Sequence, residues 1–488
     1  MALITIIVGR AAQFLIALIT LRVATTLLSP EEMGKVALVV TTTAFFALLL
    51  INPVGMFINR RLHAWQASGR GVGYLVRYAG YIALVATIAA ISLPLFVMTG
   101  LVNFGIPTVW LIALVCGSVI FNTVNQTAIP CLNLLGDSRR FILLTVATLI
   151  ASFIAAVTLV QTVQRTAEYW ILGILLGQAL LALVGTRDLF AQLNRGNPAY
   201  IQQPVYRQHL MVLFAFSWPV AIAAGLGWVQ AQGYRYLMVE DLGLAQVGLF
   251  VAGYGLSAGI IAGFESVLTT YFQPRLYRDA SATDPQLQTT AWRRYASAVI
   301  PSLVLTVGLL IVLAPDLTRL LLGEKFQAAA SFVIWGALAE AARVLASVYS
   351  LIAHVHMRTR WLIWPNVVGA ATSIVACSLL MPVFGAHGAG MGLTAAGALT
   401  VVTMHLVLLR KVGAGISARP ILVSLALAPA FLAIAMVLRH WLRTCHGVAA
   451  SAAQMDELLN QVADCRTRGH RIHLKVASGF VVRAGDHL

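Results

Sequence analysis

The chain has 488 residues, of which 59% are hydrophobic and 10% are charged, and its formal net charge is +16. This composition excludes an ordinary soluble globular protein, in which about a quarter of the residues are charged. Because the basic residues lie in short loops between apolar segments, we attribute the net charge to membrane topology and expect no nucleic-acid partner.

Apolar segments recur along almost the whole chain. Most of them reach the about 20 residues that an α-helix needs to cross the hydrocarbon core of a bilayer. They cover residues 3–28, 36–58, 78–99, 108–134, 141–161, 168–186, 209–233, 245–271, 295–314, 327–353, 361–382, 387–409 and 420–438. The sequence therefore predicts an all-α integral membrane protein.

The loops between these segments differ in charge. With the N-terminus in the cytoplasm, the opposite loops hold few cations, namely Lys35, Arg165, Arg235, Arg319 and Lys325. The cytoplasmic loops hold many more, among them Arg60, Arg61, Arg139, Arg140, Arg293, Arg294, Arg410 and Lys411. Since cytoplasmic loops carry an excess of Lys and Arg, we predict a cytoplasmic N-terminus.

The two halves of the chain resemble each other. Arg22 precedes Gly34 by twelve residues, and Arg235 precedes Gly248 by thirteen. Each arginine is followed by an acidic turn and then by a glycine that opens the next segment. We predict two six-helix bundles, residues 1–190 and 209–412, joined by a cytoplasmic linker at 191–208. Parallel repeats of this kind place the substrate path between the bundles.

The C-terminal end departs from this plan. An extra apolar segment is predicted at 413–440, and a polar, basic and partly disordered tail at 441–488. If residues 420–438 crossed the membrane, the basic tail would lie outside, which the charge rule disfavours. Three alternatives stay open: a re-entrant or peripheral segment, a tail tolerated outside, or a fourteenth span that has been lost.

Three stretches carry a family resemblance. They are LRVATTLLSPEEMGKVALVV from Leu21 to Val40, YFQPRLYRD from Tyr271 to Asp279, and FGAHGAGMGLTAA from Phe384 to Ala396. In this order the chain, over about residues 1–412, resembles polysaccharide flippases of the multidrug/oligosaccharidyl-lipid/polysaccharide exporter superfamily.

The resemblance implies an alternating-access transporter in the bacterial inner membrane. Such a flippase moves undecaprenyl-pyrophosphate-linked repeat units of O-antigen or exopolysaccharide from the cytoplasmic to the periplasmic leaflet. Its partners would be the lipid-linked oligosaccharide, membrane lipids, a polysaccharide polymerase and glycosyltransferases. No cofactor is implied, and the energy would come from a proton or sodium gradient or from the membrane potential.

Two other functions compete with this one. A cation-coupled multidrug exporter of the same superfamily would carry more carboxylates and fewer arginines in its cavity. A membrane-embedded glycan polymerase or assembly protein would need a large external loop, which the sequence lacks. The lack of the P-loop pattern GxxxxGK[ST] argues against a built-in ATPase, and the lack of Cys/His ligand spacing argues against a metal site. Because no loop before the tail is long enough for a catalytic domain, we expect no enzyme.

Arginines inside the apolar segments are the first candidates for the substrate site. A guanidinium stays charged and offers forked donors to phosphate oxygens. Arg10 and Arg22 lie in one segment, about 18 Å apart along a helix, so they cannot bind the same phosphate. For both, the alternative is a side chain that extends to the nearer membrane surface. Arg235 either faces Arg22 across the bundles or pairs with its neighbours Glu240 and Asp241.

Carboxylates in two segments are candidates for ion coupling. Glu340 and Arg343 are three residues apart, so they can pair on one helix face. Either this pair is static, or an arriving phosphate takes Arg343 and frees Glu340 to accept a proton. Glu265 is either a buried protonated carboxyl or a second coupling site.

Two further groups have weaker signals. Asn122 and Gln126 lie four residues apart and would bind either sugar hydroxyls or neighbouring helices. Gly255, Gly259 and Gly263 recur every four residues, and we interpret them as a surface for close helix packing.

Overall fold

The computed structural model describes residues 2–69, 71–194, 207–279, 285–356 and 358–413, together with isolated positions between 422 and 439. The chain divides into two units, Met1–Leu432 and Ala433–Leu488, and the helices below belong to the first. The extra apolar segment and the tail predicted at the C-terminus lie almost wholly outside the described residues.

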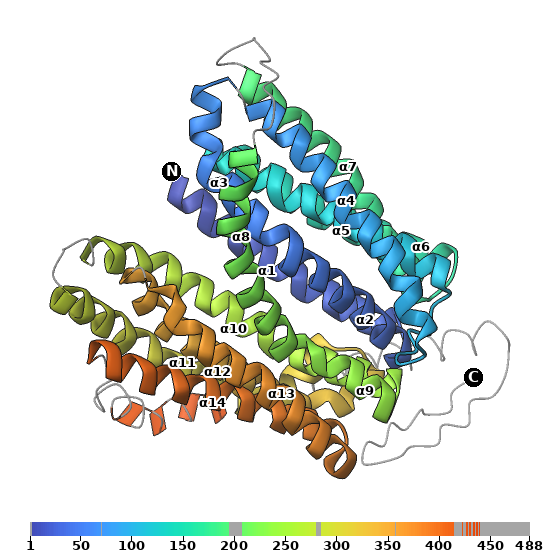
Figure 1. The fold of residues 1–488 in the computed structure, drawn as a ribbon. Coiled ribbons are helices and arrows are strands. Elements are labelled where there is room, and N and C mark those ends of the chain that lie inside the picture. Colours follow the sequence, from blue (N-terminus) through green and yellow to red (C-terminus); the bar gives the residue numbers. More distant parts are fainter. Residues whose placement is uncertain are drawn as a thin grey trace, which may run out of the picture. The chain divides into compact units, whose positions relative to one another are not determined.

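The first half forms a helical bundle that we name lobe 1 (Figure 1). It contains α1 (Ala2–Leu27), α2 (Pro30–Phe46), the π-helical turn η1 (Ala47–Ile51), α3 (Asn52–Ala67), α4 (Gly71–Met98), α5 (Thr108–Leu134), α6 (Ser138–Thr162) and α7 (Ala167–Asn194).

The second half forms the bundle that we name lobe 2. It contains α8 (Arg207–Trp228), the π-helical turn η2 (Val229–Gly233), α9 (Tyr234–Leu242), α10 (Leu244–Asp279), α11 (Pro285–Leu321), η3 (Glu324–Ala329), α12 (Ala330–Val355), η4 (Thr359–Leu362), α13 (Ile363–Phe384) and α14 (Ala386–Val412).

Twelve helical stretches in the described residues are long and apolar enough to cross a membrane. They coincide with the first twelve predicted segments, so the chain is a multi-pass membrane protein and the predicted two-bundle fold is confirmed. Several predicted segments were shorter than the helices, because helical hydrogen bonding continues past the apolar residues. For example, α11 reaches from Pro285 to Leu321, whereas the apolar segment covers 295–314.

The same packing device recurs at equivalent places in the two lobes. In lobe 1, Gly173 and Gly177 of α7 let the backbone of α6 approach closely. In lobe 2, Gly388 and Gly392 of α14 do the same against α13. Small residues at helix contacts are the usual way in which membrane helices gain van der Waals packing. The recurrence supports the internal repeat inferred from the sequence.

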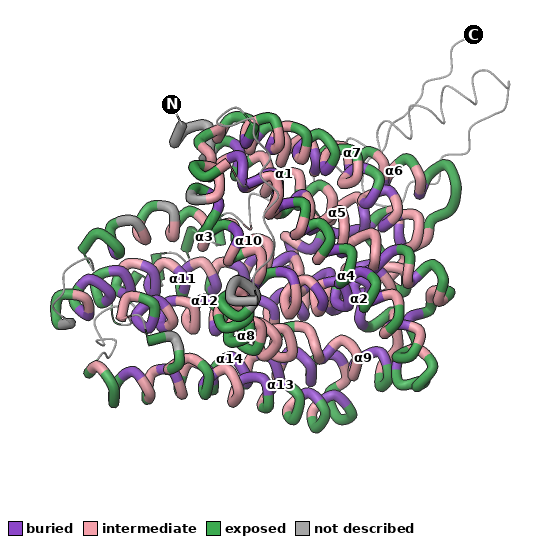
Figure 2. Tube along the Cα trace, turned by 45° about the horizontal axis from the view of Figure 1, so that its top comes forward, coloured by how far each residue is buried: buried purple, intermediate pink, exposed green. Residues whose placement is uncertain are grey.

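The side chains of α8 behave differently. Residues 211–228 include no buried side chain, and in Figure 2 the exposed ones are drawn in green and the intermediate ones in pink. Phe214 is 70% exposed and Trp218 is 50% exposed. Exposed apolar side chains of this size indicate that one side of α8 faces lipid, as expected for a membrane-spanning helix.

The lobes meet where two repeat-related helices cross. Gly34 of α2 lies against the carbonyl of Leu244 at the start of α10, and Gly248 of α10 lies against the carbonyl of Pro30. A side chain at either glycine would overlap backbone atoms of the other lobe. The two glycines that carried the repeat in the sequence therefore form a contact between the lobes.

We predict that Gly248→Ala loosens this crossing. The added methyl group overlaps the Pro30 carbonyl, and overpacking of this kind costs about 1–3 kcal/mol. The purified variant should therefore melt at a lower temperature than the unmodified protein. Gly255→Ala on the same helix is the matched control, because its methyl group meets no atom within 4 Å. Equal melting temperatures for the two variants would contradict the prediction.

Candidate functional site

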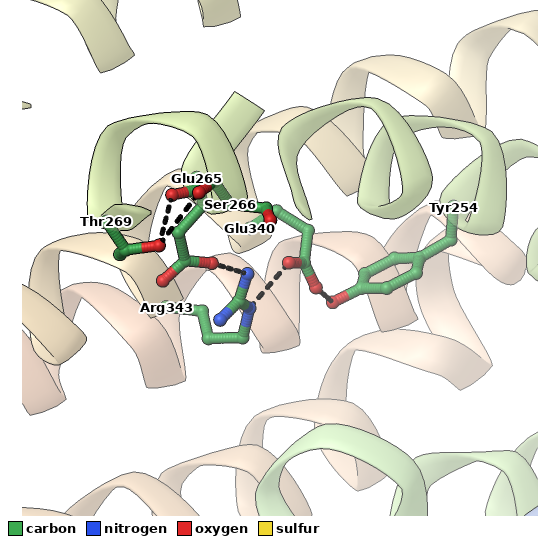
Figure 3. Close-up of polar contacts among 6 residues, drawn as sticks. All are labelled: Tyr254, Glu265, Ser266, Thr269, Glu340 and Arg343. Atoms are coloured by element: carbon green, nitrogen blue, oxygen red, sulfur yellow. Dashed lines mark hydrogen bonds and ion pairs between the residues drawn. The ribbon is translucent and has the colours of Figure 1, made fainter. Parts of the chain in front are cut away.

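Three charged side chains from α10 and α12 form one cluster (Figure 3). The Nε of Arg343 donates to Oε2 of Glu340 at 2.6 Å, and its Nη2 donates to Oε2 of Glu265 at 2.8 Å. The sequence predicted the first pair from its spacing. Glu265 comes from another helix, and the structure brings it onto the same guanidinium.

A buried tyrosine completes this cluster. The hydroxyl of Tyr254 on α10 donates to Oε1 of Glu340 at 2.7 Å. Both oxygens of Glu340 are thus engaged, and its side chain is only 8% exposed. Sequence reasoning missed Tyr254, since only the packing of α10 on α12 brings it beside Glu340.

The cluster has unequal exposure and an unbalanced charge. The Arg343 side chain is 44% exposed, whereas Glu265 is 20% exposed. With both carboxylates ionised, two negative charges face one positive charge. Arg343 is therefore a cation whose charge is already more than neutralised.

The other three candidate arginines have only neutral partners among the described residues. Arg10 is exposed, and its Nη1 donates to Oε1 of Gln13 at 3.2 Å. Arg22 donates to the carbonyl of Arg319, in the last turn of α11, at 3.3 Å. The first contact stays within α1, and the second joins lobe 1 to lobe 2.

Arg235 on α9 also reaches across the lobes. Its Nη1 donates to Oγ1 of Thr41 on α2 at 2.7 Å, and its Nε donates to the hydroxyl of Tyr234 at 3.4 Å. The alternative that Arg235 pairs with Glu240 or Asp241 is not what the structure has, since neither carboxylate is within ion-pair distance. Thr41 lies nearly two hundred residues away in the sequence, and no local pattern indicates it.

The amide pair predicted on α5 lies on one face of that helix. Nε2 of Gln126 donates to Oδ1 of Asn122 at 3.1 Å, and Gln126 is exposed. The amide that binds a neighbouring helix is instead Asn125, whose Nδ2 donates to the carbonyl of Gln178 on α7 at 2.7 Å. Asn122 and Gln126 thus keep hydrogen-bonding capacity beyond their mutual contact.

An open strip runs along α10 between two contacts with lobe 1. Gly248 touches α2, and Gly263 lies 3.0 Å from the ring of Phe14 on α1. Between them, an added methyl group at Gly255 or Gly259 would meet no atom within 4 Å. Our interpretation of these two glycines as packing residues was wrong.

The fold resembles solved transporter structures. The lipid II flippase MurJ in an inward closed conformation matches with a TM-score of 0.63 and 13% identity, covering 90% of this chain and 92% of that one. An inward-facing multidrug resistance MATE family transporter of the MOP superfamily matches with a TM-score of 0.60 and 14% identity, covering 83% of this chain and 98% of that one. The fold is that of MOP superfamily transporters.

An outward-facing MATE family transporter has the same fold at a TM-score of 0.51 and 13% identity, covering 83% of this chain and 93% of that one. All of these identities are low, so the MOP superfamily likeness establishes the fold and leaves the substrate to chemical argument. The fold class that the sequence resemblance implied is confirmed.

A separate match concerns the C-terminal end. Residues 433–488 match the family model of the TilS substrate binding domain. A tRNA(Ile)-lysidine synthase of Polaromonas naphthalenivorans (strain CJ2) is 63% identical over 54 residues, which are 11% of this chain. The chain spans 16% of that relative's length, so this short match shows no family for the chain as a whole. The match covers the C-terminal residues that did not fit the predicted membrane topology.

We predict that Arg343→Gln destabilises the protein through the cluster. Glu340 would lose its cation while staying buried, at a cost of about 1–3 kcal/mol, lowered by the 44% exposure of Arg343. The melting temperature should therefore fall. The double variant Arg343→Gln, Glu340→Gln removes the stranded charge and should recover most of the loss. A double variant less stable than Arg343→Gln would contradict this account.

Proposed function

We propose that this protein is an alternating-access flippase that moves an anionic lipid-linked oligosaccharide across the bacterial inner membrane. The substrate class that the sequence resemblance implies is an undecaprenyl-pyrophosphate-linked repeat unit of O-antigen or exopolysaccharide. The observation that carries the proposal is the set Arg10, Arg22 and Arg235, which lie in membrane spans with only neutral hydrogen-bond partners among the described residues.

These three arginines suit a pyrophosphate for a physical reason. A charged side chain inside a span costs at least a few kcal/mol, and an anion relieves that cost better than an amide or a hydroxyl does. A guanidinium can also hold two phosphate oxygens at once. Because Arg10 and Arg22 are about 18 Å apart along α1, they would meet the headgroup at different depths of its path.

The glycan would need neutral polar contacts. Asn122 and Gln126 offer amide donors and acceptors, which suit sugar hydroxyls and carry no charge of their own. Gln126 is exposed, and the two amides bond to each other. In this proposal the arginines bind the headgroup, and the amide pair on lobe 1 contacts the sugars.

Direction and energy follow from charge. The contacts of Gly34 and Gly248 lie at the helix ends that the predicted topology places on the periplasmic side, so the path would open first to the cytoplasm. A membrane potential that is negative inside favours outward movement of an anion by about 2.3 kcal/mol per charge per 100 mV. Glu265 and Glu340 add a second route, since a proton or a sodium ion at the cluster would couple its own gradient to the lobe movement.

One observation favours a second function, that of a cation-coupled multidrug exporter. The cluster of Glu265, Glu340 and Arg343 carries one more negative than positive charge when both carboxylates are ionised. Such a site suits an organic cation, as in a cation-coupled multidrug exporter. Export of cationic dyes by the reconstituted protein, lost in Glu265→Gln, would favour that function over the flippase.

We predict that Arg235→Gln and Arg22→Gln each reduce flipping by tenfold or more. The proposed reason is the loss of a charge-assisted bond to phosphate, which is worth about 1.5–3 kcal/mol. The measurement is translocation of a fluorescent undecaprenyl-pyrophosphate oligosaccharide in proteoliposomes. Arg294→Gln is the control and should flip normally, because Arg294 is exposed and lies in the part of α11 that the predicted topology places in the cytoplasm. Normal flipping by both Arg235→Gln and Arg22→Gln would refute the proposed site.

We also predict that an imposed potential changes the rate. Proteoliposomes with a potassium diffusion potential that is negative on the substrate side should flip the pyrophosphate lipid faster than those without one. A neutral lipid carrying the same glycan should show no such dependence. Equal rates with and without the potential would assign the driving force to the carboxylate cluster instead.

A further inference from the structure

Three consecutive threonines on α2 differ in what they bind. Thr41, Thr42 and Thr43 are all buried, and each hydroxyl donates to the carbonyl four residues earlier, at 2.7–2.8 Å. Thr41 also accepts from Arg235, and the Thr42 hydroxyl shares a 2.7 Å hydrogen bond with that of Tyr236. Among the described residues Thr43 makes no bond to lobe 2. Of the three threonines, Thr41 and Thr42 thus link α2 to lobe 2 by hydrogen bonds.

The bond between Thr41 and Arg235 is the exchangeable one. It joins a charged donor to a neutral acceptor, and a bond from the same donor to an anion is roughly twice as strong. If Arg235 leaves, the Thr41 hydroxyl still donates to the carbonyl of Ala37. The exchange therefore leaves no donor of Thr41 unsatisfied within the membrane.

The neighbouring bonds do not share this property. The hydroxyls of Thr42 and Tyr236 are both neutral, and the Nε1 of Trp228 donates to the backbone carbonyl of Thr41 at 3.0 Å. An anion does not compete for a bond between two neutral groups as it does for a guanidinium. Among the described residues, three hydrogen bonds reach this turn from α8 and α9, and of these only that of Arg235 would respond directly to an anionic ligand.

We propose that Thr41 is a positioning residue that holds Arg235 against lobe 1 until the headgroup takes its place. Headgroup binding then removes one of the polar contacts between α2 and α9 and eases the parting of the lobes. This inference rests on the proposed function, because it assigns the anion to Arg235. It adds a means by which occupancy of the site changes the contact between lobes.

The three threonines provide their own controls. Thr41→Val replaces the hydroxyl by a methyl group, so Arg235 has no hydroxyl to give up when the anion arrives. We expect geranyl pyrophosphate to bind the purified protein in nanodiscs about threefold to tenfold more tightly in this variant. Thr43→Val, one residue away, should bind as the unmodified protein does. Thr42→Val should also leave the affinity unchanged, although it removes a contact between lobes.

A second measurement follows the lobes themselves. Spin labels at Val163→Cys in lobe 1 and Val383→Cys in lobe 2, in a background without native cysteines, report the distance between the lobes. Both positions are exposed. Geranyl pyrophosphate should broaden or shift the distance distribution of the unmodified protein. Thr41→Val should show part of this change without ligand, and Thr41→Ser, which restores the hydroxyl, should not.

The outcomes separate the two proposals. If Arg235→Gln loses binding while Thr41→Val binds with unmodified affinity, the headgroup site stands and the role of Thr41 is overturned. If Arg235→Gln binds normally, the headgroup site itself is wrong. If Thr41→Val and Thr43→Val tighten binding equally, the effect comes from apolar substitution on α2, and the role of Thr41 is again overturned.

Discussion

An ionised arginine inside a membrane span must be met by an anion, by water or by neutral polar groups, and the arginines of this chain meet that requirement in different ways. Arg343 in lobe 2 lies between two carboxylates, Glu265 and Glu340. Arg22 and Arg235 instead bond to a backbone carbonyl and to a threonine hydroxyl, each in the opposite lobe. One arginine is neutralised, and the other two remain available to an anion.

This difference connects charge to conformation. Of the three arginines with neutral partners, Arg22 and Arg235 make bonds that cross between the lobes, so a ligand that binds either of them also acts on the contact between lobes. The crossing of α2 and α10 at Gly34 and Gly248 supplies the close backbone packing at the same boundary. Close backbone packing and hydrogen bonds between the lobes therefore occur together at this boundary.

Much of the fold could be predicted from the sequence because the membrane imposes it. The length of each apolar segment fixed twelve spans, and the spacing of Arg22, Gly34, Arg235 and Gly248 indicated the repeat. The helix ends were harder to predict, since α7 and α11 continue into polar residues without a change in hydrogen bonding. The residues beyond 413 broke the pattern in the sequence, and the family model of the TilS substrate binding domain matches residues 433–488.

The site was predictable only where it is local. The spacing of Glu340 and Arg343 gave their pairing, and that of Asn122 and Gln126 gave theirs. Tyr254 contacts Glu340, and Thr41 contacts Arg235, only because their helices pack together. The spacing of residues along one helix does not reveal such contacts. For Arg235 the nearby Glu240 and Asp241 suggested the wrong partner, because closeness in sequence was taken for closeness of side chains.

The central claim is that an anionic headgroup is held by the arginines that have only neutral partners. A structure of the protein in nanodiscs with a bound undecaprenyl-pyrophosphate oligosaccharide tests this most directly. The account predicts pyrophosphate density within hydrogen-bonding distance of Arg235 or Arg22, with the bond between Arg235 and Thr41 broken. Density for the headgroup at Arg343, with that bond intact, would contradict it.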